Sequence, residues 1–128
     1  MTIGISKVTG TIMNAVSIAN GGTTFGTALN AAAGERYDHL VFQVKLTFNS
    51  SATAGAVIHR RKSTDDGSTL TNVGTDFLSV DVNTGTPQVV EFELSGADYL
   101  EVCVENLDAN YSLTGTITYE GTKITGLG

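Results

Sequence analysis

The sequence predicts an all-β protein, an antiparallel β-sandwich of about seven to nine strands. Hydrophobic and polar residues alternate along most of the chain, as they do in strands whose side chains point to opposite faces of a sheet. Turn-forming residues separate these stretches roughly every ten residues. The composition, with 15 glycines and one proline, suits a fold with many tight turns. Helical spacing of hydrophobic residues is almost absent, so the strands are expected to account for the whole domain.

Residues 37–48 form the clearest predicted strand. Its inward face would carry Leu40, Phe42, Val44, Leu46 and Phe48. His39 and Gln43 fall on the opposite face, together with other polar residues. This pattern predicts a strand with one side in a core and the other side in water.

The same alternation predicts further strands at residues 56–61, 77–82, 88–94, 99–105 and 111–119. Asp65, Asp66 and Gly67 predict a tight turn after the first of these. In the strand at 99–105, Val102 lies among the inward residues. The last predicted strand alternates hydrophobic residues with threonines, which suit an exposed sheet face because they are β-branched and polar. Together with the strands nearer the N-terminus, this succession indicates a jelly-roll-like sandwich.

Residues 1–34 differ from the rest of the chain in charge. They carry one charged side chain, Lys7, whereas the remaining 94 residues carry 19. We predict strands at 11–19 and 23–29 with a hairpin turn at residues 20–22, followed by a short helical turn at 30–34. We interpret residues 1–34 as an N-terminal arm and residues 35–128 as the β-sandwich domain. The arm would pack either on its own domain or, exchanged, on neighbouring subunits.

Two groups of residues are candidates for interaction. The first consists of the larger hydrophobic residues of the arm, namely Ile12, Val16, Ile18, Phe25 and Leu29. The second is the basic run Arg60, Arg61 and Lys62, the only one in the sequence. This run is either a solvated strand end or a dock for an acidic neighbour.

Charge and hydropathy limit the classes of partner. The formal net charge is −6, to which residues 35–128 contribute six basic and 13 acidic side chains, or −7. Because phosphate repels an acidic surface, we expect no nucleic-acid partner. The longest hydrophobic runs are only a few residues, so we expect no membrane span, and no secretory leader is visible. A single cysteine, Cys103, cannot form an internal disulfide, which favours a reducing site of synthesis.

The sequence shows no arrangement typical of catalysis or metal binding. His39, His59 and Cys103 lie far apart along the chain without flanking ligands, which makes a poor set for zinc. The Ser-rich stretches contain no Gly-x-Ser-x-Gly motif, and no glycine cluster has the spacing of a phosphate loop. We therefore expect no catalytic residues, no metal site, no cofactor and no enzymatic activity.

A series of short segments suggests a family. Tyr-Asp-His-Leu-Val-Phe-Gln-Val at 37–44 is followed by Ala-Val-Ile at 56–58 and Lys-Ser-Thr-Asp-Asp-Gly at 62–67. Tyr-Leu-Glu-Val-Cys-Val-Glu-Asn-Leu-Asp at 99–108 and Ser-Leu-Thr-Gly at 112–115 complete the series. This order resembles small β-sandwich structural proteins of tailed bacteriophages, among them capsid decoration (cement) proteins and small head or tail proteins. The resemblance covers about residues 35–120.

The resemblance implies a virion structural protein, foremost a capsid decoration protein that binds and stabilises the capsid lattice as an oligomer. Its partners would be further copies of itself and the major capsid protein or other virion subunits. It would be made in the host cytoplasm and reside in the virion, foremost at the capsid surface. The alternative is a phage tail protein or a receptor- or carbohydrate-binding β-sandwich module. Sugar sites usually stack a ring on an exposed aromatic, whereas this chain has no Trp and its nine Phe and Tyr residues fall mostly on inward positions.

Overall fold

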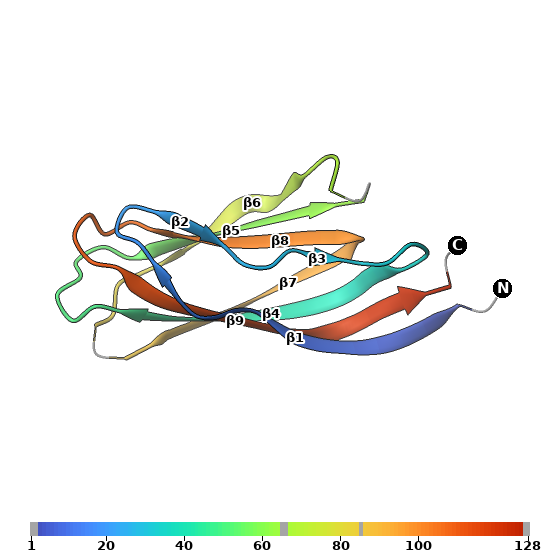
Figure 1. The fold of residues 1–128 in the computed structure, drawn as a ribbon, viewed down its shortest axis with the longest axis horizontal. Coiled ribbons are helices and arrows are strands. Elements are labelled where there is room, and N and C mark those ends of the chain that lie inside the picture. The colour runs from blue at the N-terminus through green and yellow to red at the C-terminus, as the bar shows by residue number, and fades with distance from the viewer. Residues whose placement is uncertain (1–2, 65–66, 85, 127–128) are drawn as a thin grey trace.

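The computed structural model describes residues 3–64, 67–84 and 86–126, without the side chains of 71–77 and 95–96. Within these ranges the chain forms nine strands and no helix. The strands are β1 (Gly4–Ile18), β2 (Thr23–Phe25), β3 (Leu29–Asn30), β4 (Arg36–Phe48), β5 (Ala56–Ser63), β6 (Thr71–Val80), β7 (Gln88–Ala97), β8 (Tyr99–Asn106) and β9 (Leu113–Thr125). They build two sheets that lie on each other, as Figure 1 shows. One sheet has the order β1-β9-β4-β7 and the other β2-β8-β5-β6, with β3 also paired to β8.

The strand pairs are nested in the sequence. β1 pairs with β9, β2 and β3 with β8, β4 with β7, and β5 with β6, all antiparallel. This is the pairing of one long hairpin that has rolled up, so that β4 also lies against β9 and β5 against β8. Two sheets formed in this way are a jelly roll. The predicted all-β, antiparallel, jelly-roll-like sandwich is therefore confirmed.

The core lies between the two sheets, where the alternation placed it. Phe42 of the first sheet is fully buried, and Val102 of the second sheet is 1% exposed. A row of residues crosses the first sheet at Phe42, because Tyr119 and Phe92 are its partners on the two neighbouring strands. The Phe42 and Phe92 rings stack with centroids 5.3 Å apart, and the Tyr119 ring lies 5.9 Å from that of Phe42. Gly10 ends the row on β1, where a Cβ would come within 2.6 Å of the Tyr119 hydroxyl oxygen.

Several boundaries differ from the prediction. β9 begins at Leu113, so Tyr111, which the prediction placed in this strand, lies in the preceding loop and is 38% exposed. β6 begins at Thr71, well before residue 77, because it continues the ladder with β5 past a bulge. A turn is present at Gly21, which has a φ of 66°, but it carries the chain from one sheet to the other instead of closing a hairpin. Residues 31–35 contain a turn at Gly34, with a φ of 80°, and no helix.

The charge-poor segment contributes directly to the sandwich. β1 is an edge strand that pairs with β9 along its length, and β2 and β3 lie against β8. Ile12, Met13, Ile18 and Leu29 are buried in the core. An exchanged segment would make the same contacts with a neighbouring copy, and exchange between subunits stays a prediction.

The burial of Phe42 predicts the effect of truncating it. Phe42→Ala leaves a cavity beside the Phe92 and Tyr119 rings and should lower the free energy of unfolding by roughly 3–5 kcal/mol. Gln43→Ala is the matched control, because Gln43 lies on the opposite face of the same strand, is exposed, and should change stability by less than about 0.5 kcal/mol. Urea denaturation of the three proteins measures both values. Equal losses would contradict the assignment of faces in β4.

Candidate interaction surfaces

Three loops meet at one end of the sandwich, the left end in Figure 1. They join β1 to β2, β4 to β5, and β8 to β9. Asp108 is only 2% exposed and connects all three loops. Its carboxylate accepts hydrogen bonds from the backbone N–H groups of Thr53 (2.8 Å), Ala54 (3.2 Å), Asn110 and Tyr111 (both 2.9 Å). Its backbone carbonyl oxygen accepts a further hydrogen bond from the N–H group of Gly21. The N–H donors of Asn110 and Thr53 are the main cause that lowers the pKa of Asp108 to about 2.

Asn106 extends this polar cluster toward the core. Its side-chain amide donates to the carbonyl oxygens of Ile18 (3.2 Å) and Tyr111 (2.9 Å). Its side-chain oxygen accepts the N–H of Asp108 at 3.0 Å. Because Ile18 ends β1, the amide ties the end of one sheet to the loop that leaves the other.

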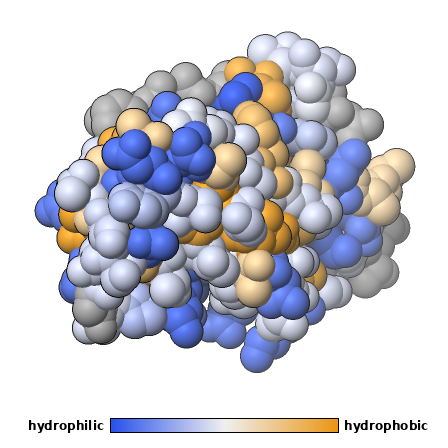
Figure 2. All heavy atoms as spheres, turned by 60° about the vertical axis from the view of Figure 1, so that its left-hand side comes forward, coloured by the Kyte–Doolittle hydropathy of each residue, from blue (hydrophilic) through white to orange (hydrophobic). Residues whose placement is uncertain are grey.

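Hydrophobic side chains project beyond this cluster. Leu107, next to Asp108, is exposed, as is Tyr111 at the far end of the same loop. Figure 2, which brings this end of the molecule forward, shows hydrophobic residues reaching the surface between hydrophilic ones. The loop thus combines a rigid polar base with hydrophobic residues available for contact.

The low pKa of Asp108 predicts a pH dependence of stability. Its folded-state pKa of about 2 lies below the reference value of 3.8, so between these values the folded state binds fewer protons than the unfolded state. The stabilisation by the carboxylate is therefore complete above about pH 4 and is lost as the pH falls through 2. Asp108→Asn should lower the melting temperature at pH 7, and its difference from the wild type should shrink as the pH falls from 4 to 2.

Asp81→Asn is the control, since Asp81 is an exposed carboxylate in the loop after β6. Its melting curves should follow those of the wild type at every pH. Thermal unfolding followed by circular dichroism measures all three proteins. If the wild type and Asp108→Asn differ by the same amount at pH 2 and pH 7, the charge of Asp108 does not hold the loops.

The basic run is divided between the two faces of β5. The Arg60 guanidinium points into the sandwich and lies 5.2 Å from the centroid of the Phe92 ring. Arg61 lies on the outer face, 5.7 Å from the centroid of the Phe25 ring, and its Nε is 3.7 Å from Glu101 Oε1. Lys62 is half-buried, opposite Leu100 in the register with β8. The three cations therefore do not form one basic surface.

Phe25 and Arg61 belong to a small cluster on the outer face of the second sheet. Phe25 is 51% exposed and is opposite Cys103, which in turn is opposite His59. His59 Nε2 lies 3.2 Å from Glu105 Oε1. Cys103 is on the predicted outer face but is buried under its neighbours, and burial raises the pKa of its thiol. A buried thiol with a raised pKa is a weak nucleophile.

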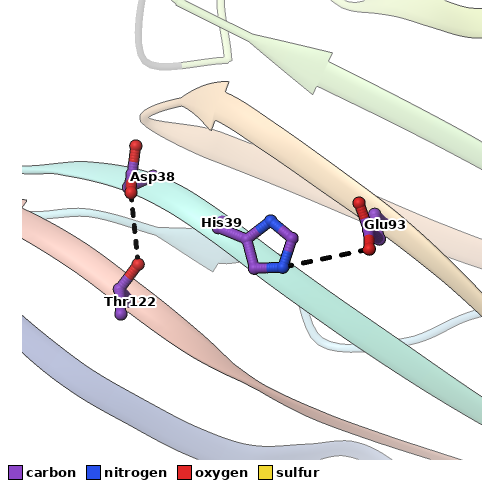
Figure 3. Close-up of polar contacts among 4 residues, drawn as sticks. All are labelled: Asp38, His39, Glu93 and Thr122. Atoms are coloured by element: carbon purple, nitrogen blue, oxygen red, sulfur yellow. Dashed lines mark hydrogen bonds and ion pairs between the residues drawn. The ribbon is translucent and has the colours of Figure 1, made fainter.

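The outer face of the first sheet is polar. His39 Nε2 lies 3.9 Å from Glu93 Oε1, and the Thr122 hydroxyl donates to Asp38 Oδ2 at 3.3 Å, as Figure 3 shows. Beside these pairs is an open depression of about 520 Å³. It is lined by Thr9, Gly10, Thr11, Val41, Gln43, Glu91, Thr118, Tyr119 and Glu120. Gln43 donates to Glu91 across it at 3.2 Å. Hydroxyl, amide and carboxylate groups suit a hydroxyl-rich ligand or a polar protein surface.

Among the residues that the structure describes, no three His, Cys, Asp or Glu side chains are grouped so that they could hold a metal ion. No helix in the described ranges is long and hydrophobic enough to cross a membrane.

The hydrophobic candidates of residues 1–34 are distributed over core and surface. Ile12, Ile18 and Leu29 are buried, Val16 is half-buried, and Phe25 is exposed. The sequence interpretation missed the first part of β1, where Ile5 is 72% exposed, and Ile3 just before the strand is 61% exposed. The signal was present, because Ile3, Ile5 and Lys7 alternate with smaller residues, but a strand was expected only from residue 11. Asn106 and Asp108 were not among the candidate residues, although Asn and Asp at this spacing often hydrogen-bond nearby backbone N–H groups.

No family model matches the chain, and no curated protein matches it. Solved structures of virus particles do resemble it in fold. A chain in the structure of the infectious bursal disease virus Gx strain has a TM-score of 0.61 at 14% identity, covering 96% of this chain and 32% of that one. The infectious bursal disease virus VP2 subviral particle gives 0.57 at 13% identity, covering 95% and 38%. The T13 viral particle of the same virus gives 0.58 at 12% identity, covering 97% and 36%.

This protein therefore spans about a third of the length of those chains. At such low identity the likeness concerns the fold alone. The jelly roll of this protein is a fold that chains of virus particles also contain.

Proposed function

We propose that this protein is a non-enzymatic structural component of a virus particle, and more closely a capsid decoration protein that binds the capsid lattice as an oligomer. Its partners would be the major capsid protein or other virion subunits, at the capsid surface. The observation that supports the proposal most is the complete jelly roll, which superposes over 96% of the chain on a chain of a virus particle. The sequence resemblance to small phage structural proteins supports it independently.

The distribution of charge suits this role. Residues 35–128 carry a net charge of −7, which keeps separate molecules soluble, while residues 1–34 carry only Lys7. A strand with so few charges meets little electrostatic repulsion when another surface approaches. Each single contact can be weak, because an oligomer that attaches at several points of a lattice gains from multivalency.

A second candidate is a tail protein or a receptor- or carbohydrate-binding module. The polar depression of about 520 Å³ on the outer face of the first sheet favours it. Its hydroxyl and carboxylate groups could bind sugar hydroxyls. Tyr119 is its only aromatic lining residue, and it packs near Phe42, so the stacking platform common in sugar sites is weakly developed.

Purified particles of the virus that encodes the chain test the proposal. Peptide mass spectrometry should detect the protein at a fixed ratio to the major capsid protein, and electron microscopy should place it on the capsid exterior. Added to particles that lack it, the purified protein should co-sediment until its sites are saturated. Its absence from purified particles, together with binding to a glycan array, would replace the decoration role with the carbohydrate-binding one.

The electrostatic contribution to attachment gives a separate prediction. If the charge-poor segment is the main adhesive, co-sedimentation should persist when salt is raised to about 1 M, where the Debye length is about 3 Å. Arg61→Gln should also leave attachment nearly unchanged, since Arg61 already lies beside Phe25 and Glu101. Release of the protein at about 0.5 M salt would instead identify a charged dock.

A further inference from the structure

The first half of β1 is an open, regular strand edge. Its register with β9 runs without a break from Gly4, opposite Thr125, to Thr11, opposite Thr118. Bulges interrupt the strand only beyond Thr11, and Ala15 there has a φ of 49°. In the described part of the chain no strand lies on the other side of β1. The backbone groups on that side of residues 4–11 are therefore placed to pair with a further strand.

The other sheet edges have features that discourage such pairing. β2 and β3 have three and two residues, too few for a long ladder. β7 carries Glu91 and Glu93 and follows Pro87, while a bulge between His59 and Arg61 interrupts the ladder that holds β6. Short edges, charges, bulges and proline are the usual protections of an edge strand. Residues 4–11 have only Lys7, so this edge is the least protected of those described.

We propose that two copies of this protein pair through residues 5–11 of β1, antiparallel and around a two-fold axis at Val8, so that their four-stranded sheets become one. Residues directly opposite each other in antiparallel strands face the same side of a sheet. The outer face of this segment carries the odd-numbered residues Ile5, Lys7, Thr9 and Thr11. A two-fold antiparallel pairing must therefore set odd-numbered residues of one copy opposite odd-numbered residues of the other. The axis then passes through a residue, and Lys7 and Val8 are the central choices.

Charge decides between these two registers. An axis at Lys7 would place the two lysines directly opposite each other, which is unfavourable. An axis at Val8 places Lys7 opposite Thr9 of the second copy. Thr9 is itself opposite Glu120, which is exposed on β9. Glu120 of the second copy is thus two strands from Lys7, about 10 Å between backbones, a gap that the extended Lys and Glu side chains can bridge.

The same register covers hydrophobic surface. Ile5, at 72% exposed, gains Thr11 of the second copy as a direct neighbour. A second copy of the chain fits this edge because each copy supplies Lys7 and Glu120. The two-fold axis therefore creates the Lys7–Glu120 pair twice.

For its biological use the inference rests on the proposed function, in which the dimer would be the unit that binds the lattice. The experiment needs no particle, so its failure and a failure of capsid attachment are separate results.

Sedimentation equilibrium of the isolated full chain at several concentrations tests the pairing. The wild type should show a monomer–dimer equilibrium. Thr9→Lys sets a like charge opposite Lys7 twice and should weaken the dimer roughly tenfold, whereas Thr9→Glu should strengthen it by a similar factor. Lys7→Glu combined with Thr9→Lys should rescue the dimer to at least the wild-type constant, because it sets opposite charges directly across from each other twice. Thr114→Lys and Thr114→Glu are the controls, because Thr114 is exposed on the same outer face but pairs with β1 only beyond its bulges.

Cross-linking tests the register. In a Cys103→Ser background, Val8→Cys should form a disulfide-linked dimer on mild oxidation, because the two residues lie directly opposite each other. Lys7→Cys should cross-link much less. Melting curves verify that each variant is folded. A protein that stays monomeric, a dimer unaffected by Thr9→Lys, or cross-linking through residue 7 as efficient as through residue 8 would overturn the proposal.

Discussion

A buried carboxylate holds together one end of the sandwich. Asp108 accepts hydrogen bonds from backbone N–H groups of two loops and, through its carbonyl oxygen, from a third. A jelly roll crosses between its sheets several times, and each crossing leaves backbone groups that the ladders cannot pair. One side chain with two oxygens satisfies four of these groups without adding length to any loop. The relative position of β1, β4 and β9 at this end depends on that arrangement.

The sequence predicted the local pattern of the fold much better than its long-range pairing. Residues 37–48 have the strand and the faces that alternation indicated, with Phe42 in the core. The glycines at 21 and 22 correctly marked a turn, but the partners of the flanking strands lie about 90 residues away, on β8 and β9. A turn signal describes four residues, whereas the choice of partner depends on the whole core. Pairing of that kind cannot be read from local residue types.

The same limit applies to the surfaces. Alternation is sufficient to place Arg60 inward and Arg61 outward, and the structure adds that each lies over an aromatic ring from a different strand. The contact of Arg61 with Phe25 crosses three strands of the second sheet, so no spacing in the sequence reveals it. The first strand was recognised only in part because Gly4 and Gly10 interrupt its hydrophobic pattern. Gly10 has a structural reason, since the Tyr119 ring occupies the space of its missing side chain.

The nested order of the strands also determines when each can form during synthesis. The ribosome produces β1 before the other strands of the sandwich, whereas its partner in the sheet, β9, emerges after them. The charge-poor strand therefore waits without this partner while the rest of the sandwich is made, and its pairing has the longest sequence separation among the described ladders. Long-range pairing of this kind is slow, and an unpaired strand is exposed to other chains meanwhile. On a polysome, the β9 of a neighbouring nascent chain competes for β1, so the topology itself creates an opportunity for strand exchange.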